Sequence, residues 1–155
     1  VERIGAYAFA DCQALAELDI RGRIRELGES VFSECSALTE FMIPKTVEKI
    51  GDYAFSGCAS LKSITIPAAV TEIGKGVFAG CSNLEEVCIC GEVKKLGAEA
   101  FVNCTNLRMI RIRESIPNRI LGEIFEQQKG LTVSCPKGSR TEAYCKKKGI
   151  SCIIN

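Results

Sequence analysis

Cysteine is the residue type in this chain with the widest chemical repertoire, and ten of its 155 residues are cysteines. Thiols pair as disulfides, bind soft metal ions and act as nucleophiles. The chain contains no histidine. This excludes Ser-His-Asp and Cys-His catalysis, histidine proton transfer and the zinc sites that use imidazole. The spacing of the cysteines therefore decides what chemistry remains.

Half of the cysteines form a regular series. They recur every 23 residues, at Cys12, Cys35, Cys58, Cys81 and Cys104. This series predicts a small, buried, apolar side chain with a weak S–H donor in each copy. Neighbouring thiols in such a column are parallel copies that do not point at each other, which disfavours disulfides. A linear column also lacks the tetrahedral reach of a metal site.

The other five cysteines are irregular: Cys88, Cys90, Cys135, Cys145 and Cys152. Cys88 and Cys90 lie two residues apart on a predicted strand, so both should point outward on one face. A disulfide among the five, or to a segment outside this chain, stays open because spacing does not give connectivity. Cys135 with Cys145 or Cys152 is the best candidate pair. We expect most thiols to be reduced, although secreted proteins often carry disulfides.

The cysteine column is one part of a repeat of 23 residues. The copies begin at Ile4, Leu27, Ile50, Ile73 and Leu96. Phenylalanine recurs with the same period at Phe9, Phe32, Phe55, Phe78 and Phe101, and leucine at Leu15, Leu38, Leu61, Leu84 and Leu107. A fixed period in this range is the signature of a solenoid, in which each unit buries its apolar residues against the next.

The third copy shows how one unit should fold. Asp52–Phe55 predicts a short helical turn, and Gly57 suits the positive φ at its end. Leu61–Ile66 alternates between apolar and polar residues, which predicts a strand that ends at Pro67. Val70–Ile73 predicts a second extended piece. Stacked copies should place these strands in a parallel ladder.

The repeated pattern I-G-x-x-A-F-x-x-C-x-x-L-x-x-I-x-I-P-x-x-V-x-x-I resembles the BspA-type (Treponema pallidum type) leucine-rich repeat family. The resemblance implies an α/β fold, a right-handed leucine-rich-repeat solenoid with a parallel β-ladder and short helical turns. It also implies a bacterial cell-surface or secreted protein, often an adhesin or interaction module. The family pattern contains no catalytic residues, and none are assigned here; no cofactor or metal is expected.

One domain, residues 1–155, should hold five full repeats: 4–26, 27–49, 50–72, 73–95 and 96–118. Residues 119–155 should form a degenerate sixth repeat and a C-terminal cap, because an open stack end exposes its core. In this cap, Ser139–Gly149 predicts a helix with a polar N-cap, a basic last turn and a closing glycine. Ile150–Ile154 predicts a last strand. No N-terminal cap is visible, so we expect a longer array.

The outward strand positions differ most between copies, and we expect function there. This face should be concave and should change from acidic in the early copies to basic in the late ones. It carries few aromatic residues, which argues against a strong binding hot spot, and the alternative is an ordinary solvated face. The candidate contacts are Glu17, Asp19, Glu40, Met42, Lys62, Thr65, Glu86, Cys88, Arg108, Arg111 and Arg113.

Charge and hydropathy limit the partners. The net charge is +1, and the Lys146–Lys148 run sits at a helix end without interleaved aromatics, so no nucleic acid is expected. No apolar run reaches the roughly 18 residues of a membrane span, so no membrane insertion is expected. The leading hypothesis is a monomeric, non-enzymatic module that binds a protein or glycan outside a bacterium or on its surface. The alternatives are an architectural spacer that presents another domain, and an intracellular scaffold.

Overall fold

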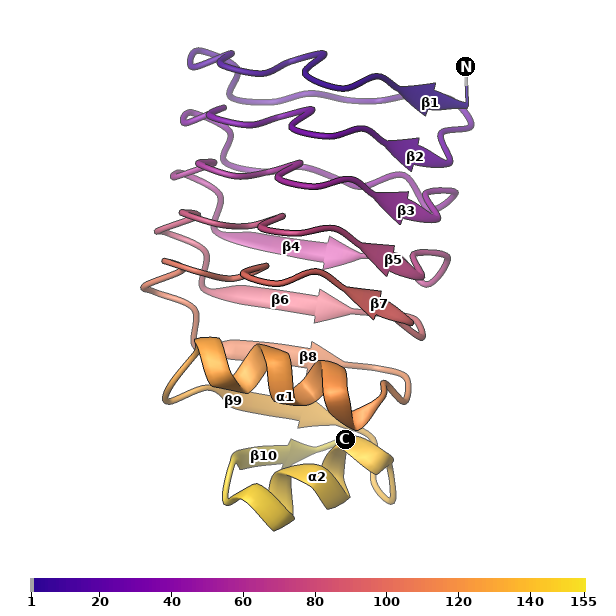
Figure 1. Cartoon of the computed structure of the whole chain (residues 1–155), viewed down its shortest axis with the longest axis vertical. Helices are drawn as coiled ribbons and strands as arrows, with labels where there is room; N and C mark the ends of the chain where they lie inside the picture. Colours follow the sequence, from indigo (N-terminus) through magenta and orange to yellow (C-terminus); the bar gives the residue numbers. More distant parts are fainter. Residues whose placement is uncertain (1) are drawn as a thin grey trace.

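The computed structural model describes residues 2–155 as a stack of coils (Figure 1). Two parallel sheets run along the stack on different sides. The first has the order β1-β2-β3-β5-β7 and consists of β1 (Arg3–Ile4), β2 (Glu26–Leu27), β3 (Lys49–Ile50), β5 (Glu72–Ile73) and β7 (Lys95–Leu96). The second has the order β4-β6-β8-β9-β10 and consists of β4 (Ser63–Ile66), β6 (Glu86–Ile89), β8 (Met109–Ile112), β9 (Thr132–Cys135) and β10 (Ser151–Ile154).

Strand register confirms that the full coils are equal in length. Ile50 pairs with Ile73 between β3 and β5, and Ile66 pairs with Ile89 between β4 and β6. The partners in both pairs are one 23-residue period apart in the sequence. The predicted parallel-ladder solenoid is therefore confirmed.

The interior is a set of identical side chains stacked on one another. The ring of Phe55 lies 5.3 Å from that of Phe32 and 5.7 Å from that of Phe78. Phe78 and Phe101 continue the column at 5.6 Å, and all four rings are fully buried. Phe9, in the first coil, is only partly buried, because among residues 2–155 just one neighbouring coil packs against it. The predicted phenylalanine core is thus present along the array.

The predicted helical turn at Asp52–Phe55 is wrong. Tyr53 and Gly57 have left-handed backbones, with φ of 55° and 74°, so no helix forms there. The backbone N–H groups of Tyr53 and Phe55 instead donate to the carbonyls of Lys75 and Val77 in the next coil, at 2.7 and 2.9 Å. A stacked neighbour offers these hydrogen bonds, and they replace those of a helix. The positive φ predicted for Gly57 is confirmed.

The expectation of an outer strand in every copy is also wrong. The equivalent segments 18–20 and 41–43 of the first two coils form no strand. Phe41 stands in the second coil where the third has Ile64, and its ring packs 4.7 Å from that of Phe32 and 5.3 Å from that of Phe55. Within residues 2–155, the second sheet begins in the third coil, at β4.

The cap contains the predicted helix and last strand, and one further helix. Helix α2 (Arg140–Lys148) begins after Ser139, whose hydroxyl accepts the Glu142 N–H at 3.1 Å, and ends at Gly149 with φ of 68°. The sequence did not predict α1 (Asn118–Gln127), which replaces the turn of the sixth copy. There Phe125 stacks on Tyr144 at 6.0 Å instead of extending the phenylalanine column. Neither helix in the described part of the chain has the length and apolar character to cross a membrane.

Candidate functional site

The repeated cysteines are structural donors. The thiol of Cys58 donates to the Phe32 carbonyl at 3.2 Å, that of Cys81 to the Phe55 carbonyl at 3.1 Å, and that of Cys104 to the Phe78 carbonyl at 3.0 Å. Burial raises the pKa of Cys58 and of Cys104 from 9.0 to about 12. Neutral, buried thiols are poor nucleophiles and poor metal ligands. From Cys35 onward the column therefore serves packing, as the spacing predicted. The predicted burial is wrong for Cys12, which is exposed in the first coil.

Cys88 and Cys90 share a face, as predicted, with their sulfur atoms 3.8 Å apart. The prediction that Cys88 is an outward contact residue is wrong, because only 9% of it is exposed. Arg111 lies directly beside it in the strand register. The neighbouring Cys88 side chain raises the pKa of the Arg113 guanidinium. Cys88 therefore offers little accessible surface to a ligand.

The remaining candidates lie on the outer side of the stack, at the predicted strand positions. Most are exposed, and Met42 is the most exposed large hydrophobic residue described, at 85%. Glu86 is partly buried. The ladder aligns Thr65, Cys88 and Arg111 in one row. It does not align Asp19 or Met42 with them, because the first two coils lack this strand.

Ion pairs change the charge of this face from what the sequence indicated. Arg108 pairs with Glu85, and Arg111 pairs with Glu86 from the preceding coil. Contact with the Glu86 carboxylate raises the pKa of Arg111. The late coils are therefore largely neutralised, not freely basic. In the early coils, Asp19 pairs with Arg21 at 2.8 Å.

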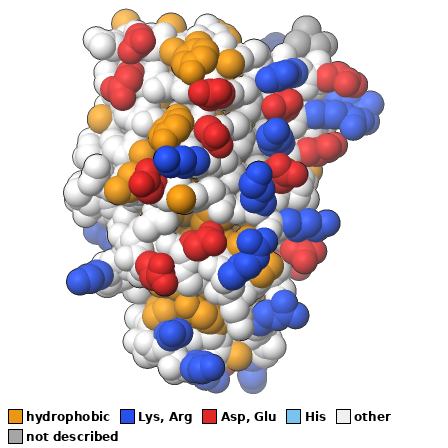
Figure 2. Space-filling view, viewed as in Figure 1, with side chains coloured by type: hydrophobic (Ala, Val, Ile, Leu, Met, Phe, Trp, Pro, Cys, Tyr) orange, Lys and Arg blue, Asp and Glu red, His pale blue; other side chains and the backbone are white. Residues whose placement is uncertain are grey.

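A second polar surface, which sequence reasoning missed, lies over the first sheet. One residue before each repeat begins, the charge alternates along the stack, in the order Arg3, Glu26, Lys49, Glu72 and Lys95. Figure 2 shows this alternation of basic and acidic side chains over the short strands of the first sheet. The sequence carried a signal for it, since these five positions keep the 23-residue period.

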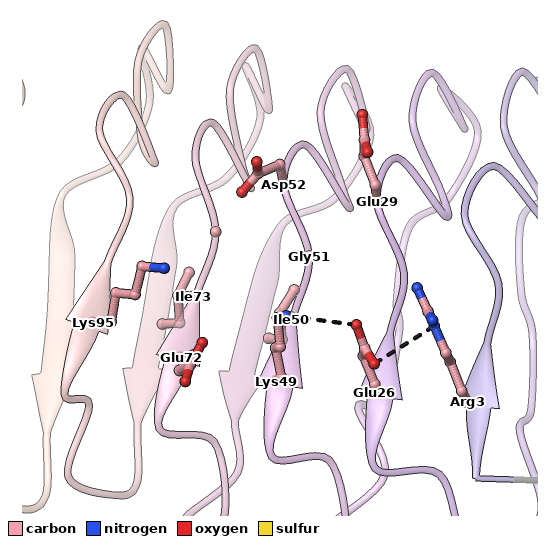
Figure 3. A pocket seen from close by; sticks show the side chains of 11 residues that line it. Arg3, Glu26, Glu29, Lys49, Ile50, Gly51, Asp52, Glu72, Ile73 and Lys95 are labelled. Atoms are coloured by element: carbon pink, nitrogen blue, oxygen red, sulfur yellow. Dashed lines mark ion pairs between the residues drawn. The ribbon is translucent and has the colours of Figure 1, made fainter.

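This charge column borders an open hollow of about 300 Å³ (Figure 3). Glu26 bridges its two basic neighbours, 3.5 Å from Arg3 and 3.8 Å from Lys49. The carboxylate of Glu26 is therefore already paired with both basic neighbours, so this part of the column offers little free charge to a ligand. Within residues 2–155, no three His, Cys, Asp or Glu side chains are arranged to hold a metal ion.

A family model matches this architecture across most of the chain. The model for the BspA type leucine rich repeat region matches residues 2–132, in six copies. The chain belongs to the BspA-type leucine-rich repeat family. A search of curated proteins finds no significant match.

Solved structures of similar proteins share the BspA-type solenoid. The T. pallidum leucine rich repeat protein is 22% identical with a TM-score of 0.74, over 99% of this chain and 79% of that one. A leucine rich cell surface protein from Faecalibacterium prausnitzii is 30% identical with a TM-score of 0.58, over 72% of this chain and 30% of that one. The pneumococcal vaccine antigen PcpA is 18% identical with a TM-score of 0.76, over 100% of this chain and 42% of that one.

This chain therefore corresponds to less than half of the length of the F. prausnitzii and pneumococcal structures. Within its BspA-type repeats, the phenylalanine column and the cysteines from Cys35 to Cys104 belong to the interior. In the charge column over the first sheet, Glu26 pairs with both of its neighbours. The variable side chains of the outer strand positions remain as the candidate site. The early coils carry the part of it with the most exposed apolar area, at Met42.

Proposed function

We propose that this chain is a non-enzymatic interaction or adhesion module of a bacterial cell-surface or secreted protein. As a monomer, it binds a protein or glycan through the outer strand face. It does not bind nucleic acid and does not insert into membranes. Its net charge of +1 gives no general attraction to polyanions.

The exposed Met42 is the observation that carries this proposal. It is 85% exposed and is flanked in neighbouring positions by the exposed carboxylates Glu17 and Glu40. Within residues 2–155, neither Glu17 nor Glu40 forms an ion pair, whereas Glu85 and Glu86 of the late coils do. An apolar side chain beside solvated carboxylates suits a ligand with an apolar patch and a basic or hydroxyl-rich rim.

The other proposed contacts continue along the same side of the stack. They are Asp19, Lys62, Thr65, Glu86, Arg108, Arg111 and Arg113. Because Arg108 and Arg111 already pair with glutamates, they should fix orientation more than they add affinity. The similarity to a leucine rich cell surface protein supports the proposed location.

Binding screens with charge-reversed variants test this proposal. The protein is assayed against a glycan array and a panel of purified extracellular proteins. The double variant Glu17→Lys/Glu40→Lys should weaken the strongest interaction about tenfold or more. The matched control is Glu72→Lys, which reverses a charge over the first sheet, away from the outer strands, and should leave binding unchanged. Equal losses in both variants, or an unchanged affinity in the double variant, would contradict the proposed face.

The spacer alternative has one specific observation in its favour. The Arg108–Glu85 and Arg111–Glu86 pairs connect successive coils, so this part of the face strengthens the stack. A spacer predicts no saturable binding to any array or panel member. It also predicts that the double variant Glu17→Lys/Glu40→Lys behaves as the wild type in every assay.

A further inference from the structure

Three cysteines meet in the C-terminal cap. Cys135 ends β9, Cys145 lies on α2, and Cys152 lies on β10. The sulfur atoms of Cys135 and Cys152 are 3.1 Å apart. Cys135 and Cys145 are fully buried, whereas Cys152 is partly exposed. A reagent in solution therefore reaches Cys152 first.

This arrangement differs from that of the repeat column. Each buried column thiol donates to a carbonyl of the preceding coil, as Cys81 does to Phe55. Cys135 and Cys152 are only 17 residues apart. They are therefore not equivalent positions of two repeats, and their side chains need not point in parallel. The sulfur of one lies against the sulfur of the other, which is the starting arrangement for a bond between them.

Strand register places the two thiols on one side of the sheet. Cys152 lies opposite Val133, two residues before Cys135 on β9. Residues two apart on a strand point to the same face, so Cys135 and Cys152 are diagonal neighbours on the side that α2 covers. Diagonal neighbours on a sheet have Cα atoms about 7–8 Å apart, slightly beyond the usual range of a disulfide, so the bond needs a small backbone shift. Strand β10 is the edge strand of its sheet, with no strand beyond it to resist a small shift.

We propose that Cys135 and Cys152 form a redox-responsive disulfide that fastens the last strand to the stack, with a small-molecule disulfide such as oxidised glutathione as the oxidant. Burial raises the pKa of Cys152 to about 12, so only a small fraction is thiolate at neutral pH and the reaction is slow. That thiolate attacks one glutathione sulfur and forms a mixed disulfide. The released glutathione takes up the proton that Cys152 lost. Cys135 then loses its proton, attacks the Cys152 sulfur and displaces the second glutathione, which takes up that proton. Two protein thiols are oxidised, and one glutathione disulfide is reduced to two thiols.

The bond closes the loop that contains α2. At present β10 pairs on one side only, with β9, and its Ile153 and Ile154 are 50% and 39% exposed. A covalent link from Cys152 to the buried Cys135 limits fraying of β10 and of α2 together. The oxidised cap then holds β10 and α2 in place in an oxidising exterior, and the reduced cap opens more readily.

Peptide mapping after equilibration of the full chain with oxidised glutathione tests this inference. Lysine and arginine residues separate the three cap thiols, so trypsin releases them in different peptides: residues 130–137, 141–146 and 149–155. We expect a cross-link between peptides 130–137 and 149–155 to form before any other. At that stage eight of the ten cysteines should remain alkylatable after denaturation. The thermal midpoint should rise by about 5 °C, and the reduced protein should not show this rise.

Single substitutions provide matched controls. Cys152→Ser should abolish the cross-link and the rise in thermal midpoint. Cys145→Ser and Cys88→Ser should keep both, because neither thiol takes part. The inference is overturned if the first bond joins peptides 141–146 and 149–155 or forms elsewhere. It is also overturned if all thiols of the wild type stay free at equilibrium, a result that does not depend on how any variant folds.

Discussion

The rings of Phe55 and Phe78 lie 5.7 Å apart with their planes only 14° from parallel, and both are fully buried. One repeat of 23 residues separates them in the sequence. The same relation holds between Phe78 and Phe101. Stacking of like residues from successive coils is therefore the interaction that the array repeats along its length.

Truncating one ring of this column should destabilise the whole array. Phe55→Ala removes a ring that packs on both sides, against Phe32 and Phe78. We expect a loss of about 3–5 kcal/mol in the free energy of unfolding, measured by chemical denaturation. Phe9→Ala is the matched control, because Phe9 is partly buried and stacks on Phe32 alone among the column rings. Its loss should be clearly smaller, and equal losses would argue against a shared interior.

The glycine at the start of each repeat should be required by close approach of the coils. A Cβ on Gly51 would lie 2.7 Å from the Glu29 backbone nitrogen, closer than packing allows. Gly51→Ala should therefore cost about 1–3 kcal/mol. Gly5→Ala changes the same position of the first coil, where a Cβ meets nothing within 4 Å. That control should be neutral or slightly stabilising in the same denaturation assay. Comparable losses of stability in both variants would mean that close approach of the coils is not the reason why glycine is required at this position.

Alkaline pH should weaken the fold through the buried thiols. In the folded chain, burial raises the pKa of Cys58 and Cys104 to about 12, from 9.0. An unfolded thiol ionises near its ordinary pKa, whereas the folded one stays protonated. Below pH 9 the thiol is protonated in both states, and its contribution to the free energy of unfolding is fully present. This contribution is lost as the pH rises from 9 toward 12. Each such thiol should add a slope of about 1.4 kcal/mol per pH unit in this window.

Denaturation at several alkaline pH values measures that slope. Cys58→Ala removes one buried thiol and should make the slope of unfolding free energy against pH shallower by the contribution of that thiol. A slope that is the same in Cys58→Ala and in the wild type would show that this thiol ionises alike in both states.

Sequence periodicity predicted the interior because the stack repeats one contact many times. The positions of Phe55, Cys58 and Ile66 within a coil follow from that rule alone. The cap helix was predictable for a local reason, since Ser139 and Gly149 are strong end signals. Such features depend on nearby residues or on exact copies, and both can be read from a single sequence.

Features that depend on contacts with another coil, or with residues that do not follow the repeat, were not predicted. The turn around Tyr53 looked helical because its hydrogen-bond partners belong to the next coil. Helix α1 lies in the sixth copy, where Gln128 donates to the Phe101 carbonyl at 2.6 Å in place of a thiol. The pairing of Arg111 with Glu86 required a register that the alternation of a single strand does not give.

Removal of one whole repeat tests most directly whether equal coils stack in register. The variant that lacks residues 50–72 joins Lys49 to Ile73, which restores the pattern of strand and turn at the junction. We predict that it unfolds cooperatively on heating, followed by far-UV circular dichroism, with a moderately lower midpoint than the wild type. The variant that lacks only residues 50–61 breaks the period and should show no cooperative transition. A cooperative transition in the shorter deletion, or none in the variant without residues 50–72, would contradict the stacked-coil account.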